Sequence, residues 1–190
     1  IRDDGPQNHF VKAGTPTMGG LLILSALMFS TLLWALLDSP YVWIVVLVTL
    51  AFGLIGFADD YAKVTKQNSK GVSSRVRFLS GLVIAGLADY AAAQFHPAAL
   101  TYQLAVPLFK NVLVNMGIFF VPFGMIVIVG AANAVNLTDG LDGLAIMPVM
   151  IAAATLGIIA YVVGHANFAD YLGVHLVPGT GELLIFAAAL

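Results

Sequence analysis

The feature that most constrains this chain is a series of long apolar stretches with almost no charged residues. Five of them approach or reach the roughly 20 helical residues that cross the hydrocarbon core of a bilayer, and Asp89 is the only charged residue within the five. They cover residues 18–37, 41–58, 78–93, 112–132 and 144–163. A further apolar run begins at Leu183. The sequence therefore predicts an all-α, polytopic transmembrane helical bundle, with about five complete transmembrane helices and the start of a sixth.

The composition agrees with this fold class. Only 9% of the 190 residues are charged, whereas an average soluble domain has about 25%. The net charge of −2 lacks the basic surplus that a nucleic-acid-binding protein needs, so we expect no nucleic-acid partner. The absence of cysteine excludes thiolate metal sites, disulfides and cysteine nucleophiles from these residues.

The two ends of the chain indicate a piece of a longer protein. Residues 1–12 are polar and charged, unlike the start of a signal peptide. The last apolar run, from Leu183 to Leu190, is too short to cross a bilayer. We therefore expect residues 1–190 to be a single integral-membrane domain that is incomplete at both ends.

The basic residues predict the orientation in the membrane. If successive spans alternate in direction, residues 1–12, 59–77 and 133–143 lie on one side. That side then carries every lysine and arginine of the chain except Lys110. Because cytoplasmic loops are enriched in lysine and arginine, we expect this side to face the cytoplasm.

Three polar clusters fall on that side, and the first is the segment KAGTPTMGG at residues 12–20. It places Lys12 before a glycine-rich helix start, where free backbone N–H groups and a lysine suit a phosphate or a carboxylate. The same pattern is also typical of a plain capped helix whose glycines allow close packing.

The second cluster is the adjacent pair Asp59 and Asp60, followed by Lys63. Two neighbouring carboxylates are easier to ionise beside a cation, and Mg²⁺ is commonly held by one or two carboxylates plus substrate phosphates. Successive helix positions point about 100° apart, so the two acids can serve different roles. A solvated helix end balanced by nearby lysines is the alternative.

The third cluster is a run of polar residues that recur every three positions: Asn133, Asn136, Asp139 and Asp142. On a helix this spacing forms one stripe, unless the two Asp-Gly steps break the helix and let the backbone approach a ligand. Asparagines that bond between helices are the structural alternative. Together, the three clusters suit a phosphorylated substrate and a divalent cation, since phosphoryl transfer relies on positioning and charge neutralisation.

Three motifs make the chain resemble a known family. GTPTMGG (residues 14–20), GFADDYAKV (56–64) and NAVNLTDGLDGLA (133–145) are similar to those of the bacterial phospho-N-acetylmuramoyl-pentapeptide transferases (translocase I, MraY). The opening IRDDGPQNHF and the segment NSKGVSSR share the likeness. DGLDG alone indicates only the wider superfamily of polyprenyl-phosphate sugar-1-phosphate transferases.

The resemblance implies a reaction and a location. The family transfers phospho-MurNAc-pentapeptide from UDP-MurNAc-pentapeptide to undecaprenyl phosphate, which yields lipid I and UMP in peptidoglycan biosynthesis. It uses Mg²⁺, and its fold of ten transmembrane helices places the active site on the cytoplasmic side of the bacterial inner membrane. We accordingly expect a Mg-dependent phosphoglycosyl transferase and a catalytic domain; a homodimer is left open.

The resemblance also implies roles for individual residues. Asp59 and Asp60 match the family's aspartate pair, of which one deprotonates or orients the lipid phosphate and the other helps to position the diphosphate and the metal. Asp139 is the third candidate catalytic residue. Lys12 and Thr17 match the nucleotide pocket, and Lys63 matches a basic residue near the phosphates. The candidate ligands of the nucleoside and diphosphate are Asn133, Asn136, Asp139 and Asp142.

Two elements of the family pattern are absent from these residues: an aspartate in a Phe-Met-Gly-Asp stretch, which is the main metal ligand, and a His-rich loop. In the family both follow the part that this chain resembles, so we expect residues 1–190 alone to be inactive. One alternative function is transfer of GlcNAc-1-phosphate from UDP-GlcNAc to a polyprenyl phosphate. A more remote alternative is an ion-coupled membrane transporter, which predicts polar residues deep inside several helices.

Overall fold

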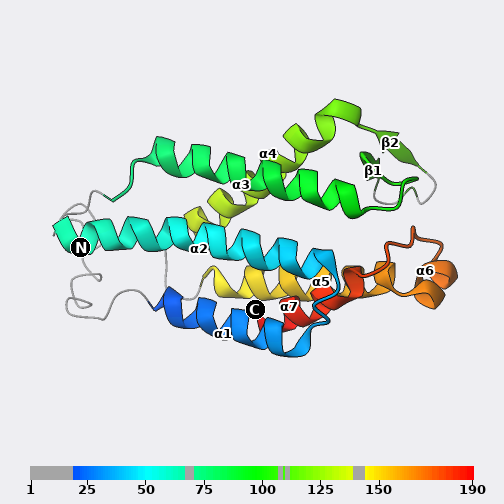
Figure 1. Ribbon diagram of the computed structural model, residues 1–190, viewed down its shortest axis with the longest axis horizontal. Coiled ribbons are helices and arrows are strands. Elements are labelled where there is room, and N and C mark those ends of the chain that lie inside the picture. The colour runs from blue at the N-terminus through cyan, green and yellow to red at the C-terminus, as the bar shows by residue number, and fades with distance from the viewer. Residues whose placement is uncertain (1–18, 67–70, 107–108, 110–111, 139–143) are drawn as a thin grey trace.

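The computed structural model describes residues 19–66, 71–106, 109, 112–138 and 144–190. These residues form a bundle of antiparallel helices with one small hairpin (Figure 1). The longer helices are α1 (Gly20–Trp34), α2 (Pro40–Lys66), α3 (Ser74–Phe95), α4 (Phe120–Thr138) and α5 (Ile146–Gly164). The shorter elements are β1 (Gln103–Ala105), β2 (Leu113–Asn115), η2 (Gly117–Phe119), α6 (Ala166–Leu172), η3 (Thr180–Glu182) and α7 (Leu183–Ala189).

Four helical segments are long and apolar enough to cross a membrane: Pro40–Lys66, Ser74–Phe95, Gly117–Thr138 and Ile146–Gly164. Large apolar side chains on their outer surfaces are exposed, including Leu54 on α2 and Ile126 on α4. An apolar surface of this extent is unfavourable in water and is stable against lipid or further helices. The predicted all-α membrane bundle is therefore confirmed.

The first predicted span differs from the structure. It was expected over residues 18–37, but the described part contains the 15-residue helix α1, which ends at Trp34. Ala35 is extended, with ψ of 148°, and the Leu36 N–H donates to Glu182 Oε2 at 2.9 Å instead of continuing the helix. Pro40 then begins α2, because the first helical turn tolerates its missing N–H. The apolar run thus extends past the end of the helix.

Other predicted boundaries also shift. The span expected to end at residue 58 continues to Lys66, so Asp59 and Asp60 lie inside α2 rather than after it. The run expected to start at residue 112 begins with β2 and η2, and its helix α4 extends to Thr138. The segment 165–181 carries four glycine or proline residues, yet it contains the short helix α6, which ends where Gly173 takes the left-handed conformation (φ 62°). Apolar runs mark the membrane-sized core of a helix, whereas backbone hydrogen bonding sets its ends.

The connection between α3 and α4 contains a short antiparallel hairpin. Leu104 pairs with Val114 in an antiparallel register between β1 and β2. This hairpin and α6 lie at one end of the bundle (right in Figure 1). The opposite end brings together the start of α1, the end of α2, the start of α3 and the end of α4. The described parts of the three polar clusters therefore share one end, as predicted.

A cluster of buried apolar residues lies where α1, α2 and α7 meet. Leu27 and Met28 of α1 pack with Val42 and Val46 of α2, and Phe186 of α7 covers them. The remaining helices contribute few fully buried side chains in the described part. This core fixes α1 against α2, and that pair carries the candidate site.

Candidate functional site

The candidate site is centred on the last turns of α2, where Asp59, Asp60 and Lys63 share one side of the helix. Lys63 lies four positions after Asp59 and three after Asp60, and these spacings bring helical side chains into contact. Its Nζ is 2.5 Å from Asp59 Oδ2 and 3.2 Å from Asp60 Oδ1. These pairs explain why the helix continues through a run of polar residues: the opposite charges stabilise the turn that carries them.

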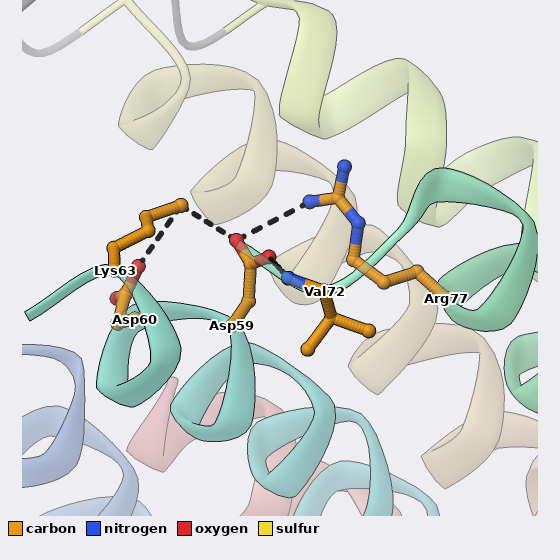
Figure 2. A network of polar contacts seen from close by, with 5 residues as sticks. All are labelled: Asp59, Asp60, Lys63, Val72 and Arg77. Carbon is orange, nitrogen blue, oxygen red and sulfur yellow. Dashed lines mark hydrogen bonds and ion pairs between the residues drawn. The ribbon is translucent and has the colours of Figure 1, made fainter. Parts of the chain in front are cut away.

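Asp59 is buried, with 6% of its surface exposed, and both of its oxygens are engaged (Figure 2). The Val72 N–H donates to Oδ1 at 2.8 Å. Oδ2 accepts from Lys63 and, at 3.4 Å, from Arg77 Nη1. A buried carboxylate is stable only when paired and hydrogen-bonded, and these three donors meet that requirement. Asp59 thus joins the end of α2 to the start of α3.

Asp60 has a different environment. Half of its side chain is exposed, and Lys63 is its one partner among the described residues. Because adjacent helix positions point about 100° apart, Asp60 faces away from the segment that engages Asp59 (Figure 2). The two acids therefore differ: both oxygens of Asp59 have partners, whereas Asp60 keeps one oxygen available in the described part of the chain.

Asp60 lies at the end of an apolar groove between α1 and α2. The groove has a volume of about 410 Å³, and Asp60 is its one charged lining residue in the described part of the chain. Leu21 and Leu24 of α1 and Phe57 of α2 form part of its wall. Gly53 lets the two helices approach closely, since a Cβ there would lie 2.6 Å from Leu24 Cδ2. The groove therefore leads from apolar walls to the carboxylate of Asp60, which pairs with Lys63.

The segment before α3 completes the surroundings of Asp59. Ser73 is the N-cap of α3, and its Oγ accepts a hydrogen bond from the Val76 N–H at 3.4 Å. Gly71 lies directly against the acid, because a Cβ there would collide with Asp59 Oδ1 and lie 2.8 Å from its Cγ. Only glycine allows the backbone to approach this closely.

Sequence reasoning did not assign a role to Gly71, Val72 or Arg77. Arg77 entered only as one of the basic residues that indicate the cytoplasmic side. A signal was present: a glycine two positions before a capping serine, in the segment NSKGVSSR, is compatible with a close backbone approach. The partner of that approach was not apparent, since Val72 and Arg77 follow Asp59 by 13 and 18 positions.

The third cluster is described only in part. Asn133 and Asn136 lie on the exposed surface of the last turns of α4, and Asn133 Nδ2 donates to Val129 O at 2.8 Å within the same helix. In the described part of the chain, no hydrogen bond joins these asparagines to Asp59, Asp60 or Lys63. The other predicted site residues, Lys12, Thr17, Asp139 and Asp142, lie outside the described residues.

At this end of α2, one carboxylate among the described residues is free to bind Mg²⁺. Mg²⁺ is usually held by one or two carboxylates together with substrate phosphates. Asp60 retains an oxygen without a partner from the described residues, whereas both oxygens of Asp59 are occupied. The described residues contain no group of three His, Cys, Asp or Glu that could hold a metal. Of the two predicted metal ligands, the geometry therefore favours Asp60.

The sequence of the chain is similar to that of known proteins. Residues 12–24 match a sequence signature described as phospho-N-acetylmuramoyl-pentapeptide-transferase signature 1. Proteins named phospho-N-acetylmuramoyl-pentapeptide-transferase from Ruegeria sp. (strain TM1040), Ruegeria pomeroyi and Dinoroseobacter shibae are 68%, 67% and 63% identical to the chain over its whole length. The chain spans about half the length (53%) of these curated relatives.

The family assignment rests on a longer match. The family described as glycosyl transferase family 4 matches residues 42–188, which include α2 with both aspartates, the segment that contacts Asp59, and α4. This match covers most of the chain. The chain belongs to glycosyl transferase family 4.

Proposed function

We propose that this chain forms about half of a membrane enzyme that transfers phospho-MurNAc-pentapeptide from UDP-MurNAc-pentapeptide to undecaprenyl phosphate. The products are lipid I, for peptidoglycan synthesis, and UMP. The names of the relatives and the signature at residues 12–24 support the transferred group, phospho-MurNAc-pentapeptide. The UDP-linked donor and the lipid acceptor are what the family resemblance implies. The structural observation that carries the proposal is the apolar groove that ends at Asp60, whose carboxylate pairs with Lys63.

The groove matches the chemistry of a lipid phosphate. Its walls are apolar side chains of α1 and α2, which favour a prenyl chain over water. Its end carries Asp60 within 3.2 Å of Lys63 Nζ, so that a carboxylate and an ammonium group meet an incoming phosphate. We place the tail of the acceptor along the groove and its phosphate at this end.

The reaction requires two anions to approach each other. An oxygen of the lipid phosphate attacks the phosphorus that carries the sugar. The bond from that phosphorus to the bridging oxygen of the diphosphate breaks, and UMP leaves with the bridging oxygen. Lys63 offsets negative charge at the acceptor phosphate, and Asp60 orients the phosphate or accepts its proton. Fixed charges of this kind act where negative charge builds up, and they require no rearrangement during the reaction.

Mg²⁺ is part of the proposal. Asp60 and the substrate phosphates would hold it, with Asp139 and the aspartate expected after Leu190 as further candidates. When bound, Mg²⁺ supplies neutralisation of the diphosphate charge. Asp59 contributes differently, because it holds the start of α3 against α2. Lys12, Thr17, Asn133, Asn136 and Asp142 stay predicted ligands of the nucleotide.

We place the enzyme in the bacterial inner membrane, with Asp60 toward the cytoplasm. Lys63, Lys66, Arg75 and Arg77 all lie at the same end of the bundle as Asp60, and basic residues favour the cytoplasmic side. A soluble UDP-linked precursor reaches the site from that side. The assignment of residues 1–190 to one catalytic domain, and the homodimer, stay predictions.

The proposal is tested with a chimera in which this chain replaces the matched part of the Ruegeria sp. relative. Purified chimera is supplied with undecaprenyl phosphate, Mg²⁺ and either UDP-MurNAc-pentapeptide or UDP-GlcNAc, and UMP release is measured. We expect release with the first nucleotide and none with the second. Release only with UDP-GlcNAc supports the alternative sugar, and release with neither contradicts the transferase proposal.

The acceptor groove makes a separate prediction. Replacing Gly56 with leucine fills the groove without a clash, since a Cβ at Gly56 meets nothing within 4 Å. We expect the KM for undecaprenyl phosphate to rise about tenfold, because the loss of about two buried methylene contacts at about 0.8 kcal/mol each is close to the 1.4 kcal/mol that a factor of ten requires. The KM for UDP-MurNAc-pentapeptide should change less than twofold.

Gly130 provides the matched control, since it is an exposed helical glycine of α4 and a Cβ added there would also meet nothing within 4 Å. Gly130→Leu should leave both KM values unchanged. Equal acceptor KM values for Gly56→Leu, Gly130→Leu and the unmodified chimera would show that the acceptor binds elsewhere.

A further inference from the structure

Lys63 pairs with both Asp59 and Asp60. How strongly it is held by Asp59 depends on the other partners of that acid. The Lys63 Nζ lies 2.5 Å from Asp59 and 3.2 Å from Asp60, and only Asp60 faces the groove. Asp59 has a second cationic partner, Arg77, whose Nη1 is 3.4 Å from the same oxygen that Lys63 contacts. The charge of the buried acid is therefore divided between a lysine of its own helix and an arginine of α3.

The backbone holds this arrangement in a defined geometry. The Val72 N–H occupies Asp59 Oδ1, so that both cations are directed to Oδ2 (Figure 2). Gly71 lies so close to the acid that a Cβ would collide with Asp59 Oδ1 and lie 2.9 Å from Lys63 Cε. Displacement of this segment would therefore move both Asp59 and the lysine that it shares with Asp60.

We propose that Arg77 is a positioning residue of the transfer reaction: by pairing with Asp59, it keeps Lys63 available to Asp60 and to the phosphate at the end of the groove. Without Arg77, Lys63 is the one cation from the described residues that still pairs with the buried Asp59, and it is drawn fully to that carboxylate. The phosphate end of the groove then loses its positive charge. This role rests on the proposed function, and Arg77 acts through Asp59 and Lys63 rather than by touching a substrate.

The geometry distinguishes this role from a simple surface ion pair. An exposed pair between two long side chains contributes little to stability and nothing to rate. Here the acid is buried, and its other oxygen is fixed by a peptide N–H, so removing Arg77 changes the charge balance at Asp59 rather than at the surface. Since Arg77 makes a single contact through Nη1, lysine can replace its charge.

The test uses the chimera with Arg77→Met, which keeps the side chain's length and removes its charge. We expect kcat for UMP release to fall about tenfold, which is less than the 10²–10³-fold typical of deleting a charge-stabilising donor, because Lys63 is displaced and not removed. The KM for UDP-MurNAc-pentapeptide should stay within about twofold. Arg77→Lys should recover kcat to within about threefold of the unmodified chimera.

A second readout needs no substrate. Val72→Cys, in a chimera otherwise free of cysteine, is labelled with a maleimide, since Val72 is half-buried beside Asp59. Arg77→Met and, independently, Gly71→Ala should each raise the labelling rate severalfold. Arg77→Met removes a cationic partner of Asp59, which holds the Val72 N–H, and the Cβ of Gly71→Ala pushes the segment away from Asp59. Lys66→Ala is the charge control: it removes a basic residue at the same end of α2 that has no ion pair in the described part.

The outcomes separate the two proposals. If the unmodified chimera transfers no sugar phosphate, the proposed function is wrong, and the labelling rates still decide whether Arg77 restrains the segment. If Arg77→Met leaves kcat within twofold, or lowers kcat without raising the labelling rate, the positioning role is wrong. A rise in nucleotide KM that lysine does not reverse would also overturn it, since that indicates a direct contact with substrate.

Discussion

Asp60→Asn is expected to lower kcat for UMP release by the chimera by at least about 10²-fold, within the range observed when a general acid or base is removed. Asp60 is the charged lining residue of the groove in the described part, and it has an oxygen free for a phosphate proton or for Mg²⁺. Asparagine has nearly the same shape but neither accepts a proton nor binds a cation with comparable strength. Nucleotide binding, measured by calorimetry, should be nearly unchanged.

Asp59→Asn is the matched comparison, because the two acids are adjacent and receive the same isosteric change. Asp59→Asn should also lose transfer activity, and it should lower the melting temperature of the protein as well. The new amide side chain would still accept from the Val72 N–H, but Lys63 and Arg77 would lose their anionic partner. Removing one member of such a network destabilises by about 1–3 kcal/mol. Normal turnover in Asp60→Asn would contradict the catalytic role of Asp60. Full stability in Asp59→Asn would contradict the structural role of Asp59.

Residues 1–190 expressed alone are expected to release no UMP above background, a loss of more than about 10³-fold relative to the chimera, because catalytic groups that act as a unit fail together when part of the unit is removed. At the end of α2, the described residues supply one available carboxylate, Asp60, and the described part of the chain holds no group of three potential metal ligands. The family resemblance places a further aspartate and a His-rich loop after the part that this chain covers. The assay compares the purified chain and the chimera at equal concentration.

Co-expression provides the control for a chain that is merely misfolded. Supplying the rest of the Ruegeria sp. relative as a second polypeptide should restore UMP release if the two halves assemble in the membrane. Measurable release by residues 1–190 without the second half would show that the site is complete within them.

Much of the fold could be predicted from local sequence. Apolar runs with at most one charged residue predicted the helices α2 to α5, because a chain that crosses lipid must satisfy its own backbone polar groups and a helix does so. Where each helix ends could not be predicted in the same way. Trp34 is followed by a turn although Leu36 and Leu37 are apolar, and the Leu36 N–H is instead bonded to Glu182, which is 146 positions away.

The candidate site was predicted in part for a similar reason. The spacing of Asp59, Asp60 and Lys63 is local, and helix geometry alone brings the three together. The local sequence does not show whether each acid has an oxygen free to bind a substrate or a cation. The answer depends on Val72 and Arg77, which reach Asp59 only because α3 returns alongside α2.

The central claim is that the end of α2 transfers a sugar phosphate to a lipid phosphate, and product analysis tests it most directly. The chimera is incubated with UDP-MurNAc-pentapeptide labelled in its sugar and with undecaprenyl phosphate, and the label in the lipid extract is compared with the UMP released. We predict one labelled lipid per UMP, and loss of both in Asp60→Asn. UMP release without labelled lipid, or labelled lipid formed at an undiminished rate by Asp60→Asn, would contradict the claim.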